Sequence, residues 1–352
     1  MTSLSQSYRS RGSFKDRDYI RTGEGLVFCV VGDVHPPGWV TAYLKYIIRR
    51  EERPWRILAY YSLPHVEETL SYLKANHPKY LFVDRFSGLK FSAVPRSEVK
   101  VHYRPEQALR RLKVKPRDQL EDKALRLAEL LSEASNVDLE RFGVSGSILL
   151  GIHNLKYSDV DLVVYGLEES MKVKEALLRL YGDPETPIEK FSGEKLKAWC
   201  EEKSMLHPLT LEEAEEIYRR TWNRGIFEGT VFSIHPVRAD YEVKDKYGSE
   251  RFKAEGIVEA EATITEDRES IFLPAKYRVG EVKILSGPNV DGIVEIVSYE
   301  GLYSGIFNVG ERVKVRGLLE KISPLEDEEK SYYRILIGSR AACGRDYIKP
   351  KP

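Results

Sequence analysis

Residues 143–165, GVSGSILLGIHNLKYSDVDLVVY, decide how the centre of the chain folds. A short apolar strand ends at Ser145, Gly146 and Ser147, and the apolar residues that follow predict the start of a helix. Small residues at such a turn let backbone N–H groups approach phosphate oxygens, and the N-terminus of a helix adds positive charge. The segment ends in a second apolar strand. It therefore predicts a strand, a turn, a helix and a strand arranged around an anion site.

Two aspartates, Asp159 and Asp161, lead into the second strand. Residues at alternate positions of a strand point to the same face, so we expect the two carboxylates to lie close together. Such a pair repels unless a divalent cation lies between its members. Oxygen ligands suit Mg²⁺ or Mn²⁺ that is held together with substrate phosphates. The sequence therefore predicts a metal site at Asp159 and Asp161, beside a phosphate site at Gly146 and Ser147.

Taken together, these residues resemble the DNA polymerase β-type nucleotidyltransferase superfamily. That family carries Gly-Ser, a second glycine, and then Ser-Asp-apolar-Asp on an apolar strand. The matching residues here are Gly146, Ser147, Gly151, Ser158, Asp159 and Asp161. A predicted amphipathic helix over residues 118–134 also fits the family's order, and the resemblance extends to about residue 240. The whole chain is similar to an uncharacterised archaeal group of predicted nucleotidyltransferases, and the similarity rests on Arg21-Thr22, Val31-Gly32, His35-Pro36-Pro37 and Trp222-Asn223-Arg224-Gly225.

The resemblance implies a Mg²⁺-dependent (or Mn²⁺-dependent) enzyme that moves a nucleoside monophosphate from a nucleoside triphosphate (NTP) to an acceptor and releases pyrophosphate. Asp159 and Asp161 would bind the metal. The nucleotide would be held by Gly146, Ser147 and Ser158. Arg220 and Arg224 precede a predicted strand over residues 230–238, and could supply further cations for the triphosphate.

Two departures from the family pattern bear on activity. Leu149 and Leu150 stand where the family often carries Ala-Arg, so an arginine near the phosphates is missing. The family also commonly places a third carboxylate on a later strand, but residues 230–238 contain no acid, and His235 stands where one might be. Asp240, just past this strand, is the candidate third acid. Without one, we expect weak activity or none, because a base would be lacking.

The acceptor is left open by the sequence. Residues 96–117 carry eight basic and two acidic side chains, which is typical either of a phosphate contact surface or of a solvated helix face. The candidate nucleic-acid contacts are Arg104, Arg110, Arg111, Lys113 and Lys115. The leading acceptor is an RNA or DNA 3′ hydroxyl, and the competing ones are a protein hydroxyl (AMPylation) and a small molecule. The alternative of another class is a non-catalytic nucleic-acid-binding protein that keeps the fold.

A chain of 352 residues suggests two or three domains. We expect a multidomain α+β protein with a flexible basic arm (residues 1–22), an N-terminal α/β domain of unknown role (23–105), a central polymerase β-like nucleotidyltransferase domain with a mixed sheet and helices (106–245) and a C-terminal small all-β barrel, OB-like (246–352). Short strand-like runs with glycine turns mark the last region. Its many aromatic residues predict either an oligonucleotide-binding face or ordinary core.

Composition narrows the class of protein further. Lys+Arg and Asp+Glu both number 55, so any basic surface is local. No apolar run reaches the roughly 20 residues of a membrane span, and the polar start of the chain lacks a secretory signal. Three widely spaced cysteines favour reduced thiols. These features predict a cytoplasmic protein with no membrane association, and they leave the preferred base and the oligomeric state open.

Overall fold

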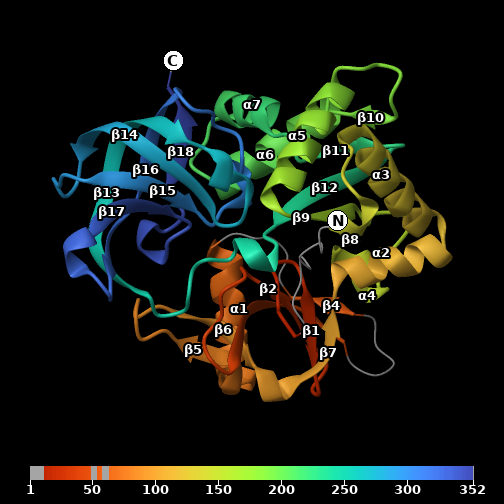
Figure 1. Cartoon of the computed structure of the whole chain (residues 1–352), viewed down its shortest axis with the longest axis horizontal. Coiled ribbons are helices and arrows are strands. Elements are labelled where there is room, and N and C mark those ends of the chain that lie inside the picture. Colours follow the sequence, from red (N-terminus) through yellow and green to blue (C-terminus); the bar gives the residue numbers. More distant parts are fainter. Residues whose placement is uncertain (1–11, 49–53, 58–62, 352) are drawn as a thin grey trace, which may run out of the picture.

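The computed structural model describes residues 12–48, 54–57 and 63–351. Three separate sheets build the fold, and they succeed one another along the chain. Figure 1 shows the N-terminal sheet at the bottom, the central sheet with its helices at the upper right and the C-terminal strands at the upper left. The protein is therefore a mixed α+β, multidomain structure, as predicted. Among the described helices, none is both long enough and apolar enough to cross a membrane.

The N-terminal sheet is antiparallel throughout. Its order is β5-β6-β3-β2-β1-β7, with β4 paired to β3. The strands are β1 (Tyr19–Thr22), β2 (Leu26–Val30), β3 (Trp39–Ile47), β4 (Trp55–Arg56), β5 (Leu81–Val83), β6 (Lys90–Pro95) and β7 (Val99–Tyr103), and one long helix accompanies them, α1 (Leu63–Asn76). Neighbouring strands that run antiparallel need no helical crossover. The predicted α/β domain is therefore, in its described residues, an antiparallel sheet with one long helix and not a set of parallel strands joined by helices.

The folded N-terminal region begins earlier than predicted. Strand β1 lies inside the expected arm of residues 1–22, and it pairs with both β2 and β7. Lys15 and Asp18 are also buried in this segment. The prediction of a flexible arm is therefore wrong for residues 12–22, where Lys15, Asp16 and Asp18 are buried within the fold; residues 1–11 lie outside the described part of the chain.

The central sheet is mixed, as predicted, with the order β10-β11-β12-β9-β8. Its strands are β8 (Phe142–Val144), β9 (Val160–Tyr165), β10 (Ile188–Glu189), β11 (Arg224–Phe227) and β12 (Thr230–Val237). The helices are α2 (Pro105–Val114), α3 (Gln119–Ser135), α4 (Gly146–Leu150), α5 (Leu167–Tyr181), α6 (Gly193–Leu206) and α7 (Leu211–Arg220). Strands β9 and β12 are parallel, while the other neighbours are antiparallel.

Helix α3 shows how the sequence covers one face of this sheet. The Asp118 side chain accepts hydrogen bonds from the backbone N–H of Leu120 and Glu121, which caps the helix. The apolar stripe of α3 then packs in one core with Leu162 and Ile234 of the central sheet. Successive strand residues point to opposite faces. Asp161, Ser233 and His235 therefore lie on the other face, away from α3.

The C-terminal strands close into a barrel. Their order is β13-β14-β15-β17-β16, and β16 pairs back with β13 while β18 extends the sheet from β16. The strands are β13 (Glu250–Glu266), β14 (Ala275–Ser286), β15 (Ile293–Ser298), β16 (Arg312–Pro324), β17 (Tyr332–Ile337) and β18 (Tyr347–Pro350). The predicted strand-like runs correspond to β13–β17, and β18 was missed. Tyr277, Tyr303 and Phe307 are fully buried, so these aromatics form core and not a binding face.

Candidate nucleotide and metal site

Gly146 begins helix α4 and lies directly against the carboxylate of Asp161. The backbone N–H of Ser145 donates to the carbonyl oxygen of Asp161 at 2.8 Å, so the turn and β9 are joined here. Gly146 has φ of +63°, and a Cβ atom added to it would lie 2.2 Å from Asp161 Oδ2. Both the backbone conformation and this contact require glycine. Ser147, the next residue, is partly exposed. The predicted phosphate turn and the predicted metal ligands therefore meet.

The two aspartates are coupled through their charges. Repulsion from Asp161, together with burial, raises the pKa of Asp159 to about 6. Burial also acts to raise the pKa of Asp161, but hydrogen bonds from His235 and Ser233 and the charge of Lys45 outweigh it, so that this pKa lies below its usual range. Two carboxylates that oppose each other's ionisation in this way are typical of a site that binds a cation.

Strand β12 brings Ser233 and His235 beside Asp161. In the parallel register, Ser233 lies opposite Asp161, and His235 follows on the same face. Ser233 Oγ donates to Asp161 Oδ1 at 2.5 Å, while His235 Nε2 lies 2.9 Å from Ser233 Oγ and 3.4 Å from Asp161 Oδ1. Burial, aided by the charge of Arg17, lowers the pKa of His235 to about 4, so the imidazole is neutral at pH 7.

Asp240, the candidate third acid, has a different partner. It lies in a short 3-10 helix after the end of β12 and forms an ion pair with the buried Lys15. The Lys15 ammonium also donates to the carbonyl oxygen of Arg238 at 2.7 Å. The strand positions beside Asp161 are instead those of Ser233 and His235. An acidic residue is therefore missing from β12 itself, and Asp240 is engaged by the N-terminal region.

The two predicted nucleotide-binding arginines lie in different surroundings in the structure. Arg220 pairs with Glu216 and with Glu311, which ties α7 to the barrel. Arg224 lies on β11 opposite Ser233, and its charge opposes the rise in the pKa of Asp159. Arg224 is therefore the arginine that the fold brings to the aspartates. Trp222, which lies between the two arginines in the sequence, is fully buried in the core.

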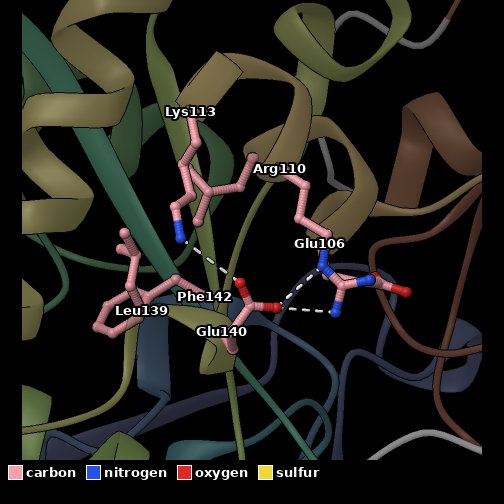
Figure 2. Close-up of a pocket in the computed structure, with 7 residues that line it drawn as sticks. Glu106, Arg110, Lys113, Leu139, Glu140 and Phe142 are labelled. Carbon is pink, nitrogen blue, oxygen red and sulfur yellow. Dashed lines mark hydrogen bonds and ion pairs between the residues drawn. The ribbon is translucent and has the colours of Figure 1, made fainter.

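The predicted nucleic-acid contacts are mostly paired within the protein. Figure 2 shows Arg110 and Lys113 paired with Glu140. Arg110 Nη2 lies 2.9 Å and Lys113 Nζ 3.6 Å from its carboxylate oxygens. Arg111 pairs with Glu121, and Arg104 Nε donates to His102 Nδ1 at 3.4 Å. Lys115 is exposed. Acidic residues supplied by other segments therefore offset much of the positive charge that the composition of residues 96–117 predicts.

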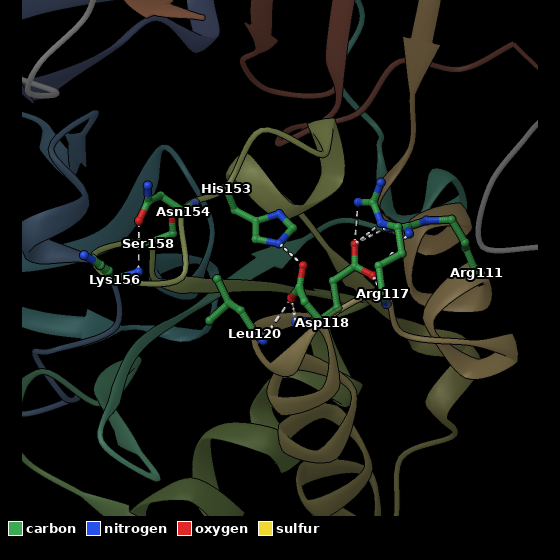
Figure 3. Close-up of polar contacts among 9 residues, drawn as sticks. Arg111, Arg117, Asp118, Leu120, His153, Asn154, Lys156 and Ser158 are labelled. Atoms are coloured by element: carbon green, nitrogen blue, oxygen red, sulfur yellow. Dashed lines mark hydrogen bonds and ion pairs between the residues drawn. The ribbon is translucent and has the colours of Figure 1, made fainter. Parts of the chain in front are cut away.

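A second acidic cluster, which the sequence analysis missed, contains Asp118, Glu121 and His153. Their possible ligand atoms all lie within 4.8 Å of one another. Arg111 and Arg117 donate to Glu121, and His153 Nε2 lies 2.8 Å from Asp118 Oδ2 (Figure 3). The other Asp118 oxygen caps α3. These partners already compensate the carboxylates, so the cluster is structural.

Ser158 closes the loop that leads into β9. Its hydroxyl accepts a hydrogen bond from the backbone N–H of Asn154 at 2.9 Å, and its own N–H donates to the Asn154 carbonyl oxygen at 2.9 Å (Figure 3). This turn fixes the approach to Asp159. The structure therefore gives Ser158 a local role in shaping the loop, besides the nucleotide contact that the resemblance implies.

Sequence reasoning also missed two basic residues of the N-terminal region. The carbonyl oxygen of Arg17 accepts a hydrogen bond from Ser145 Oγ at 2.8 Å. The charge of Lys45 acts to lower the pKa of both Asp159 and Asp161. Lys45 interrupts the otherwise largely apolar strand WVTAYLKYI. That interruption is a sequence signal for a functional lysine, but it does not indicate which part of the fold the lysine faces.

Comparison with known proteins gives one relative over nearly the whole chain. The sequence is 30% identical over 346 residues to an uncharacterised protein, MJ1086, of Methanocaldococcus jannaschii, and the match covers 95% of this chain and 98% of that protein. No family model matches the sequence, and no solved structure matches the fold. The similarity agrees with the predicted resemblance to an uncharacterised archaeal group, and it spans all three sheets.

Proposed function

The chain belongs to the family of MJ1086, and we propose that it is a Mg²⁺-dependent nucleotidyltransferase of the polymerase β type. It would move a nucleoside monophosphate from an NTP to an acceptor hydroxyl and release pyrophosphate. The observation that carries this proposal is the contact between Gly146 and the carboxylate of Asp161, next to Asp159. A glycine turn that suits phosphate and a carboxylate pair that suits a cation lie at one place.

The residues present fit one divalent cation. Asp159 and Asp161 offer oxygen ligands, and their mutual repulsion is what a cation would relieve. Ser233 occupies Oδ1 of Asp161, whereas Oδ2 faces the turn at Gly146. When bound, Mg²⁺ would neutralise phosphate charge and favour attack on the α-phosphorus.

The protein's own residues would orient the reactants. The backbone at Gly146 and the hydroxyl of Ser147 would hold phosphate oxygens, and Arg224 would add a cation beside Asp159. The acceptor oxygen would form a bond to the α-phosphorus as the bond to pyrophosphate breaks. We assign Ser233 and His235 to positioning Asp161, because both contact its carboxylate and neither is charged at neutral pH.

A nucleic-acid 3′ hydroxyl is the acceptor that we propose. Five strands close the C-terminal barrel, and the pairing of β15 with β17 is parallel while its other closing pairs are antiparallel. This arrangement supports an OB-like assignment, a fold class that binds oligonucleotides. Lys276 and Arg278 are at least partly exposed on β14. The proposed acceptor rests on the form of the barrel, because the basic side chains of residues 96–117 are mostly paired, and Lys276 and Arg278 also pair, with Asp245 and Glu295.

One observation favours a second candidate, a non-catalytic nucleic-acid-binding protein. Strand β12 contains no acidic residue, and the position beside Asp161 is held by Ser233. A protein of this fold without a third carboxylate could bind an NTP or RNA and transfer nothing. The two candidates therefore differ in turnover and not in binding.

Label transfer separates the candidates. The full chain would be incubated with each α-³²P-labelled NTP, with Mg²⁺ or Mn²⁺, and with RNA, DNA or protein acceptors. Asp159→Asn and Asp161→Asn would be compared with Asp291→Asn, a change at an exposed barrel loop. We expect label in nucleic acid that both site variants lose and that Asp291→Asn keeps. Label in protein would replace the acceptor by a protein hydroxyl. Bound NTP without any label transfer would favour the non-catalytic candidate.

A further inference from the structure

One face of the N-terminal sheet lies against the segment that begins with Gly146. Tyr19, Cys29 and Tyr46 of this sheet form a buried cluster that includes Leu149 and Leu150. Figure 1 shows the same neighbourhood, with α4 next to the N-terminal strands. The two leucines that replace the family's Ala-Arg therefore serve as the apolar contact for another part of the chain. The sheet that they contact forms one wall of the candidate site.

Lys45 is a buried cation on this wall. It is only 6% exposed, and its ammonium donates to the Tyr19 hydroxyl at 2.7 Å. The ammonium also lies 5.4 Å from the ring centre of Tyr19 and 5.7 Å from that of Tyr46. Burying an ammonium is costly unless anions or dipoles compensate it. Tyr19 belongs to the buried cluster that includes Leu149 and Leu150, so the ammonium lies on the face of the sheet that meets α4.

The segment before β1 reinforces this wall. The Ser145 hydroxyl donates a hydrogen bond to the carbonyl oxygen of Arg17. The charge of the Arg17 side chain also helps to lower the pKa of His235. Arg17 has φ of +68°, a conformation in which a residue with a side chain is strained. The strain is compensated by the bonds around it, because Asp16 accepts from Gly32 and pairs with Arg17. The segment is therefore held firmly next to the phosphate turn.

We propose that the N-terminal sheet completes the phosphate site, with the Lys45 ammonium contacting the triphosphate of the NTP. This inference rests on the proposed function of Asp159 and Asp161. A triphosphate brings more negative charge than one divalent cation balances, and α4 offers no basic side chain. Lys45 would supply the cation that Leu149 and Leu150 cannot. Tyr19 is a positioning residue, because its hydroxyl fixes the ammonium.

The test measures nucleotide binding by the full chain and by Lys45→Met. Isothermal titration with an NTP, a nucleoside monophosphate and a nucleoside, each with Mg²⁺, gives three dissociation constants. Loss of one charge-assisted contact should weaken NTP binding about tenfold or more, and nucleoside binding hardly at all. Lys45→Arg should retain most of the NTP affinity. Lys90→Met, at an exposed position of the same sheet, is the matched control.

Two further measurements separate a loss of NTP binding from a loss of folding. Thermal unfolding reports whether Lys45→Met still folds, and Tyr19→Phe, which keeps the ring and the lysine, should weaken NTP binding in the same direction by a smaller factor. Equal NTP affinity of wild type and Lys45→Met would overturn the role of Lys45 and leave the proposed function standing. A wild-type protein that binds no NTP would overturn the proposed function and this inference together.

Discussion

Asp161 Oδ2 occupies the space that a side chain at residue 146 would need. A Cβ atom on Gly146 would lie 2.2 Å from this oxygen, which is far below a real contact distance. The glycine thus serves a purpose besides its left-handed backbone conformation, because it lets a carboxylate reach the start of α4. A phosphate bound at the turn would therefore lie close to a cation bound by the aspartates.

Gly146→Ala should therefore be more damaging than an ordinary loss of a left-handed glycine. Gly193→Ala is the matched control, because Gly193 begins α6 with φ of +52° and a Cβ there would meet nothing within 4 Å. We expect a loss of unfolding free energy of about 1 kcal/mol for Gly193→Ala from backbone strain alone. Gly146→Ala should lose roughly 3 kcal/mol, since overpacking adds about 2 kcal/mol. Urea unfolding measures both, and equal losses would contradict the close approach.

Neutralising the two aspartates should change stability in opposite directions. The charge of Asp161 and burial raise the pKa of Asp159 to about 6, so its ionisation destabilises the fold fully above pH 6, and the cost disappears below about pH 3.8. Asp159→Asn should therefore stabilise the metal-free protein at pH 7, by about 1 kcal/mol after allowance for solvent screening.

Asp161→Asn should destabilise the protein, because hydrogen bonds to the ionised carboxylate hold its pKa low. Thermal unfolding in EDTA at pH 7 and pH 4 tests both variants. Shifts of the same sign at pH 7 would contradict the assignment of the raised pKa to Asp159. Added Mg²⁺ should stabilise the wild type and neither variant, since each variant has lost a ligand.

The local sequence predicted the central region well because its signals are short-range. The capping aspartate and apolar stripe of α3 predicted that helix almost to its ends, and the residues from Gly146 to Asp161 predicted the meeting of turn and strand. The barrel was predicted from its recurring strand-like runs. β18 is a short strand that lacks such a pattern.

Long-range contacts could not be predicted in the same way. Residues 12–22 are polar and basic in sequence, yet Lys15 is buried because Asp240, far along the chain, pairs with it. Arg110 and Lys113 were predicted to contact phosphate, but both side chains form ion pairs with Glu140. The position of Lys45 depends on how the N-terminal sheet docks on α4, and no local pattern encodes that docking.

His235→Asp should create the carboxylate that β12 lacks. The new acid would stand on the same face as Asp161, so repulsion should lower the stability in EDTA by roughly 2 kcal/mol. Mg²⁺ should then stabilise this variant more than the wild type, and label transfer should rise if the missing acid limits turnover. His235→Asn is the neutral control. Equal stabilisation of both variants by Mg²⁺ would show that residue 235 does not face the cation.

Glu121→Gln should make the stability of the protein less dependent on pH in the acid range. Burial acts to raise the pKa of Glu121, but hydrogen bonds from Arg117 and Arg111 outweigh it and lower this pKa to about 2. The folded-state pKa thus lies below the ordinary 4.5, so the stabilisation is fully present above about pH 4.5 and is lost as the pH falls toward 2.

We expect Glu121→Gln to cost about 2 kcal/mol at pH 7, a value reduced because Arg111 and Arg117 are 39% and 52% exposed. The variant should also lose less stability than the wild type between pH 4.5 and 2. Urea unfolding at several pH values measures both effects, with Glu140→Gln as a control in which both partners of the glutamate are exposed. Parallel pH profiles for Glu121→Gln and wild type would show that the two arginines do not hold this carboxylate ionised.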